Sequence, residues 1–165
     1  MGNRGEYKLQ VLLKLRGQER ELAEESYAEA MAVHRALSEK VRRLKKEHGA
    51  MIEVRRQKCR AFDEEVVANS LSVAEINGFD HHLQGLRARE EEIWDKVEMA
   101  RDEERQARRR MELAHRELVE AVRQLKAVEK HQEKWSAQKA LEEQRRASTR
   151  DDELAARVWR EQQST

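Results

Sequence analysis

The stretch VVANSLSVAEINGF, residues 66–79, carries one charged side chain, Glu75, in a chain whose residues are 41% charged. Long runs of Glu, Lys and Arg lie on both sides of it. Asn69 and the two serines prefer helix caps and turns to helix interiors, because their short polar side chains hydrogen-bond to nearby backbone groups. Ser72 and Glu75 have the spacing of a capping box, in which each side chain accepts a hydrogen bond from the other residue's backbone amide. The stretch therefore predicts a bend near residues 68–73, followed by a second helix.

The composition around this bend is typical of long helices with a large surface. Aromatic residues make up 4% of the chain, proline is absent, and the net charge is only +1. A single cysteine, Cys59, excludes an intramolecular disulfide, and no Cys/His cluster has zinc-finger spacing. The apolar run LQVLLKL, residues 9–15, is too short to span a membrane and has no cleavage-like sequence after it. We therefore expect a soluble, cytoplasmic protein that needs no cofactor and does not insert into the membrane.

Apolar residues recur at alternating steps of three and four along both halves of the chain. This alternation averages 3.5 residues per turn and keeps one stripe facing a partner helix, so it indicates the seam of a coiled coil. The pattern is weaker in the first half, where two histidines lie on the stripe and the phase shifts after Met51. The seam comprises Leu9, Leu13, Ala23, Tyr27, Ala30, His34, Leu37, Val41, Leu44, His48 and Met51 in the first half and Ile76, Phe79, Leu83, Leu86, Glu90, Ile93, Val97, Ala100, Glu104, Ala107, Met111, Ala114, Leu118, Ala121, Leu125, Val128, Gln132 and Trp135 in the second.

The two seams match each other if the chain folds back as an antiparallel hairpin. Opposite residues must then have numbers with a constant sum, and a sum of 141 pairs the seams throughout, for example Val41 with Ala100. A shift by one heptad satisfies the periodicity equally well. The turn chemistry favours 141, because its midpoint falls between Ser70 and Leu71. The sequence thus predicts an all-α fold, a long two-helix antiparallel coiled-coil hairpin with an overhanging C-terminal helix, forming a single elongated domain over residues 1–165.

The two arms are unequal in length. With the sum of 141, residues from about Ala140 onward have no partner on the first arm. Within this overhang, Leu154, Val158 and Trp159 form a short apolar face that is either a docking element or part of a frayed end. The predicted parts are arm one, about residues 6–68; the bend, residues 69–72; arm two, about residues 73–139; and the overhang, residues 140–165.

The uncharged tip and one side-chain pair allow both structural and functional interpretations. Apolar side chains at the tip either close the end of the seam or form a contact surface. Cys59 and His82 also have numbers that add to 141, and with His81 they would approach each other across the hairpin. Since no Asp or Glu completes a tetrahedral set of ligands there, we do not expect a metal site.

Charged residues on the arms favour solvated helix faces. The basic runs at residues 42–46 and 108–110 are interspersed with Glu and Asp, and the net charge is near zero, which disfavours nucleic-acid binding. Pairs four residues apart, such as Glu39 and Arg43, would stabilise the helices. The sequence has no Gly-rich phosphate loop and no nucleophile elbow, and a two-helix hairpin offers no cavity for tuning pKa values. We therefore do not expect an enzyme.

Several segments resemble the FliJ family and its injectisome counterparts, the YscO or SctO proteins of type III secretion systems. The first is YKLQVLLKLRGQERELAEESYAEA at residues 7–30, and the second is SVAEINGFDHHLQGL at residues 72–86. VEKHQEKW at residues 128–135 and RASTRDDELAARVW at residues 146–159 complete the likeness. The most telling pattern opens the second arm and consists of Ser72, Ile76, Phe79, Leu83 and Leu86.

The resemblance implies a two-helix coiled coil similar to the γ stalk of rotary ATP synthases. In this family the terminal end of the hairpin enters the pore of a hexameric export ATPase. The other part contacts the cytoplasmic domain of the membrane export gate and, in some members, secretion chaperones. The location implied is cytoplasmic, peripheral to the inner-membrane export apparatus. Transferred to this chain, the resemblance places the gate contact at Phe79, His82 and Leu86 and the ATPase-ring contact at Leu9, Leu12, Leu13, Leu154, Val158 and Trp159.

Two other classes of protein are compatible with the same patterns. A generic coiled-coil scaffold or adaptor would share the seams, but it needs no neutral bend in its middle. A helical protein that bridges nucleic acids would bind with a steep salt dependence. The hairpin pattern favours the export-ATPase stalk over both.

Overall fold

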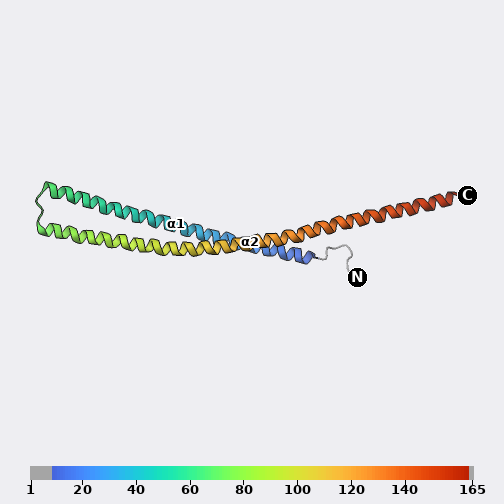
Figure 1. Ribbon diagram of the computed structural model, residues 1–165, viewed down its shortest axis with the longest axis horizontal. Helices are drawn as coiled ribbons and strands as arrows, with labels where there is room; N and C mark the ends of the chain where they lie inside the picture. Colours follow the sequence, from blue (N-terminus) through green and yellow to red (C-terminus); the bar gives the residue numbers. More distant parts are fainter. Residues whose placement is uncertain (1–8, 164–165) are drawn as a thin grey trace. The chain divides into compact units, whose positions relative to one another are not determined.

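The computed structural model describes residues 9–163, which form two long helices (Figure 1). Helix α1 spans Gln10–Ala68, and helix α2 spans Val73–Gln163. The residues between them, 69–72, are the predicted bend, which is thereby confirmed. The part of the first arm predicted at residues 6–8 and the last two residues of the overhang lie outside the described residues.

Backbone and side-chain hydrogen bonds define both edges of the bend. The amide of Asn69 donates to the carbonyl of Glu65 over 2.9 Å, and the amide of Ile76 donates to the carbonyl of Ser72 over 3.2 Å. Ser72 and Glu75 form the predicted capping box. The Ser72 amide donates to the Glu75 carboxylate over 2.7 Å, and the Glu75 amide donates to the Ser72 hydroxyl over 3.3 Å. Helix α2 therefore begins with its first free amides partly satisfied.

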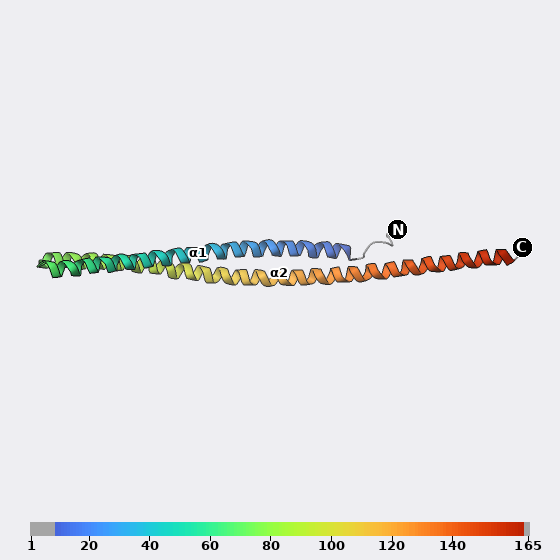
Figure 2. The same cartoon turned by 90° about the horizontal axis from the view of Figure 1, so that it is seen from above.

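The chain contains two compact units, which we describe separately. The hairpin unit, Glu25–His115, contains the bend and the parts of α1 and α2 on either side of it. The terminal unit combines Met1–Glu24 with Arg116–Thr165. In the hairpin unit the two helices run antiparallel and side by side, as Figure 1 and the turned view in Figure 2 both show.

The core of the hairpin unit consists of the predicted seam. Val97 is fully buried, and Ala100 is 1% exposed. Small and branched side chains dominate because two helices packed along one stripe leave little space between their backbones. All the buried hydrophobic residues of the described chain lie on the predicted stripe: Val41, Leu86, Ile93, Val97, Ala100, Ala107 and Ala114.

Contacts between the two helices fix the register of the hairpin unit. Phe62 stacks on Phe79 with ring centroids 3.8 Å apart and planes inclined by 2°, and their numbers add to 141. The Lys40 ammonium lies 2.7 Å from the Glu103 carboxylate, a pair with numbers that add to 143. A shift by one heptad would change the sum by seven. The predicted sum of 141 is therefore confirmed.

The seam changes phase after Met51, as the sequence indicates. Arg55 and Cys59 follow at steps of four and are partly buried, which places a charged residue at the interface. The Arg55 guanidinium lies 2.7 Å from the carboxylate of Glu90, itself one of the polar residues on the second seam. The hydrogen bond and the negative charge of Glu90 raise the pKa of Arg55. The two charged residues that interrupt the apolar stripe therefore neutralise each other at the interface.

In the terminal unit the seam is looser than in the hairpin unit. Gln10 and Gln132 hydrogen-bond across the two helices over 3.5 Å. Leu13 and Trp135 are partly buried, whereas every residue from Ala140 to Gln163 is exposed. Partial burial in the described part of α2 therefore ends at Lys139.

Candidate functional site

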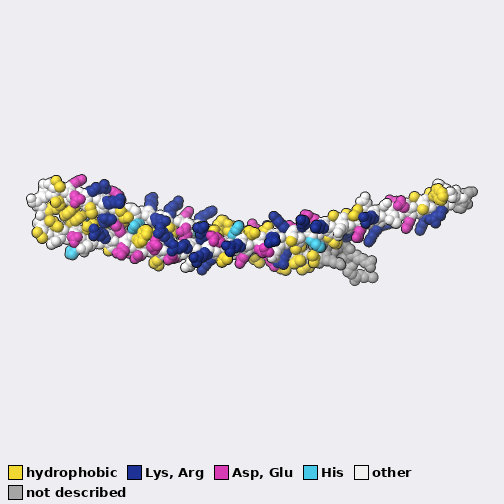
Figure 3. All heavy atoms as spheres, in the orientation of Figure 1, with side chains coloured by type: hydrophobic (Ala, Val, Ile, Leu, Met, Phe, Trp, Pro, Cys, Tyr) yellow, Lys and Arg dark blue, Asp and Glu magenta, His cyan; other side chains and the backbone are white. Residues whose placement is uncertain are grey.

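The bend carries an exposed apolar surface, which we call the tip. Val67 is 90% exposed, Val73 is 75% exposed, and Val66 and Ile76 are each 45% exposed. Figure 3 shows hydrophobic side chains gathered at the end of the hairpin unit where the helices join. The one charged residue of the stretch, Glu75, is occupied by the capping box, and its hydrogen bonds with Ser72 lower its pKa. The tip therefore exposes apolar atoms with almost no free charge.

The three residues expected at the gate contact differ in exposure. His82 is exposed on α2. Phe79 is partly buried by its stack on Phe62, and Leu86 is 6% exposed within the seam. His82 is therefore the most accessible of the three. The stacked phenylalanines were not paired in the sequence reasoning, although the sum of 141 predicts their contact.

The residues expected at the ATPase ring lie in the terminal unit. On α1, Leu12 and Leu13 are partly buried, and Leu9, just before the helix, is 38% exposed. The apolar side chains of the overhang are much more open: Leu154 58%, Val158 52% and Trp159 60%.

The overhang also changes its apolar face. Continuing the seam beyond Trp135 by the same steps of three and four gives only polar or charged positions as far as residue 153: Lys139, Glu142, Arg146, Thr149 and Glu153. Leu154 and Val158 lie instead on a different face of the helix. At about 100° per residue, this face is rotated by more than 90° from the line of the seam. The overhang is therefore not a continuation of the hairpin seam that lacks a partner arm. This signal was present in the sequence but was not used.

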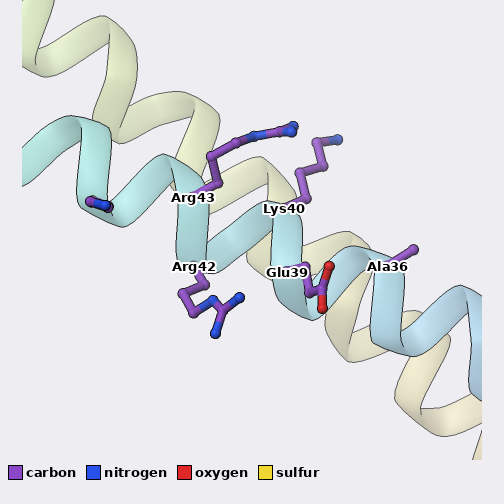
Figure 4. Close-up of a pocket in the computed structure, with 6 residues that line it drawn as sticks. Ala36, Glu39, Lys40, Arg42 and Arg43 are labelled. Carbon is purple, nitrogen blue, oxygen red and sulfur yellow. The ribbon is translucent and has the colours of Figure 1, made fainter.

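The charged surface of α1 does not form a convergent ligand site. In Figure 4, Lys40 and Arg43 point to one side of the helix, whereas Glu39 and Arg42 point to the other. The predicted ion pair between Glu39 and Arg43 is therefore wrong: the two residues lie one turn apart on the same face, but their side chains extend in different directions and form no ion pair. The shallow hollow on this surface is lined by Ala36, Glu39, Lys40, Arg42, Arg43 and Lys46.

Among residues 9–163, no three His, Cys, Asp or Glu side chains gather in a group that would hold a metal ion. Cys59 is a free, partly buried thiol. In the same range, neither helix contains a segment long and apolar enough to cross a bilayer.

The fold and the exposed surfaces define a class of protein: a helical-hairpin coiled coil with an exposed apolar tip and an exposed C-terminal overhang. The model of the YscO-like protein family matches residues 4–164. The chain therefore belongs to the YscO-like protein family.

A solved structure supports the fold. The protein CT670 from Chlamydia trachomatis, assigned as a YscO homologue, matches with a TM-score of 0.78 and 19% sequence identity. The match covers 96% of this chain and 98% of the Chlamydia chain. At this identity the likeness bears on the fold alone. A comparison with curated proteins finds no match.

Proposed function

We propose that this chain is the stalk protein of a type III protein export apparatus. It binds the hexameric export ATPase through the overhang, promotes assembly and activity of the ring, and connects the ring with the cytoplasmic domain of the export gate. Membership of the YscO-like family over nearly the whole chain supports this function. Its place is the cytoplasm, peripheral to the inner-membrane export apparatus.

The observation that carries the proposal is the state of residues 140–163. They are helical and exposed throughout, and Leu154 and Val158 lie off the line of the hairpin seam. A segment that packed on its own chain would keep the phase of the seam. Leu154, Val158 and Trp159 instead present a separate face, and the arginines around it suit a ring pore that offers both apolar and acidic contacts. Leu9, Leu12 and Leu13 contribute to the same ring contact from the first arm.

The gate contact is assigned to the part of α2 that follows the tip. His82 is its exposed centre, Phe79 contributes a partly exposed ring edge, and Leu86 holds the helix against α1. The low charge of the neighbouring tip means that little hydration of charged groups is lost when a partner covers it. Secretion chaperones are further candidates for this surface.

The function is mechanical, with no catalytic step on this chain. Hydrolysis belongs to the ATPase, and the hairpin changes how readily the ring assembles and turns over. A generic scaffold or adaptor is the competing function. It would use the coiled-coil surface and would have no effect on an ATPase.

The test is to mix the purified protein with the export ATPase encoded beside it and measure hydrolysis. The full chain should stimulate hydrolysis. A chain that ends at Lys139 should keep its helical hairpin and its gate binding, because the seam and the tip are intact, but lose the stimulation. Full stimulation by the shortened chain would make the overhang a frayed end. No stimulation by the full chain, with the ring assembled, would favour the scaffold function.

A further inference from the structure

Helix α1 has a second repeat of three and four residues on the face that points away from α2. Its positions are residues 28, 32, 35, 39, 42 and 46, all within the hairpin unit and all exposed. Two alanines begin the repeat, and four charged residues follow. We call these six residues the outer face: Ala28, Ala32, Arg35, Glu39, Arg42 and Lys46.

The charges of the outer face are not used within the chain. Elsewhere, cations on both helices pair with acids one turn away, as Arg20 does with Glu24 over 3.2 Å and Lys96 with Glu92 over 2.7 Å. No ion pair joins Arg35, Glu39 or Arg42 to any residue of the described chain. Figure 4 shows Glu39 and Arg42 on the same side of α1, directed away from the helix.

The charges of the outer face are complementary to those of a second copy of α1 that runs in the opposite direction. If a second copy of α1 lies antiparallel on the outer face, with opposite residues adding to 74, each position of the repeat meets another position of the repeat. Arg35 then faces Glu39 of the second copy, and Glu39 faces its Arg35. Arg42 and Lys46 meet Ala32 and Ala28.

We propose that the outer face of α1 is a self-association surface, on which two copies of this chain pair antiparallel about a two-fold axis level with residue 37. Isologous contacts repeat every attraction twice, so the Arg35–Glu39 pair gives two ion pairs in all. The alanine side chains leave room for the backbones to approach, and the alkyl stems of Arg42 and Lys46 cover them. The proposal concerns the hairpin itself and is independent of the export function.

A second copy explains the pattern better than an unrelated acidic partner. An acidic partner would be attracted by Arg35 and Arg42 but repelled by Glu39 between them. In the antiparallel pair the same Glu39 is required, because it is the counter-charge of Arg35 in the other copy. The alternation of positive and negative charges therefore favours a second copy in the antiparallel orientation. Coiled coils likewise select their partners by the charges that flank the interface.

Sedimentation equilibrium of the full chain at low salt tests the proposal. Exposed ion pairs give weak association, so the chain should be a monomer when dilute and approach a dimer at about 100 µM. The single variants Arg35→Glu and Glu39→Arg should each weaken the dimer by about tenfold, because each places like charges opposite one another twice. The double variant Arg35→Glu/Glu39→Arg should restore it to within about threefold, because the swap re-creates both pairs.

Matched controls separate this surface from general charge effects. Arg109→Glu and Glu91→Arg make the same charge changes at exposed positions of α2 that have no ion pair in the described chain, and they should leave the dimer unchanged. Circular dichroism should show equal helicity for every variant. A chain that stays monomeric up to about 1 mM at low salt, a dimer indifferent to the single variants, or a double variant as weak as the single ones would each overturn the proposal.

Discussion

Val97→Ala should cost more stability than truncation at any exposed valine, because Val97 is the fully buried centre of the seam. Removing two methyl groups loses about 1.6 kcal/mol of burial at about 0.8 kcal/mol each. The space left between two helices adds about 1 kcal/mol. Alanine is the better helix former by about 0.5 kcal/mol, which offsets part of the loss. The net fall in the free energy of unfolding is therefore about 2 kcal/mol.

Val33→Ala is the matched control, since Val33 lies on α1 in the same unit and is 53% exposed. This substitution loses only about half as much buried area and leaves no cavity. The gain in helix propensity nearly cancels that loss, so we expect the free energy of unfolding to fall by about 0.3 kcal/mol. Urea denaturation followed by far-UV circular dichroism gives both values. If Val97→Ala costs no more than Val33→Ala, the described seam is not the interface that stabilises the hairpin.

Further predictions concern the polar seam, the cap and the gate. Replacing both Arg55 and Glu90 with apolar residues should raise the melting temperature. Glu90→Leu alone should lower it, because the half-buried guanidinium of Arg55 then lacks its partner. Equal melting temperatures of the two variants would contradict this. Ser72→Ala should cost about 1 kcal/mol at neutral pH. Because the pKa of Glu75 is lowered on folding, its contribution is complete above the unfolded value of 4.5 and lost as the pH falls through the folded one. The difference between wild type and Ser72→Ala should therefore shrink in acid, and a constant difference would rule out the carboxylate's part. His82→Glu should weaken gate binding at unchanged melting temperature, while the same change at its exposed neighbour His81 should not; equal affinities would remove His82 from the contact.

The seam, its register and the bend were predictable because each has a strong local cause. A 3.5-residue average over so many turns is incompatible with a single solvated helix, and the antiparallel pairing then leaves only heptad-spaced registers. Ser72 and Glu75 decide among these registers, because the second helix has to begin where its cap is. The described contact of Phe62 with Phe79 follows from the same number sum.

The details of exposed side chains were not predictable in the same way. Glu39 and Arg43 have the right spacing for an ion pair, but long side chains on a solvated helix have several rotamers of similar energy, so spacing does not ensure contact. The partly buried pair of Arg55 and Glu90 depends on a shift of phase after Met51 that the sequence only suggests. No role for the exposed residues Val66, Val67 and Val73 could be predicted from the periodicity, because they lie outside the seam.

The central claim is that the overhang exists to contact the export ATPase. The most direct measurement is photo-cross-linking from a benzoylphenylalanine placed at Trp159, with the same probe at exposed Leu113 of the hairpin unit as the control. In the presence of the assembled ATPase, the account predicts a covalent product with the ATPase from position 159 and none from position 113. Equal products from both positions, or none from position 159 while hydrolysis is stimulated, would contradict it.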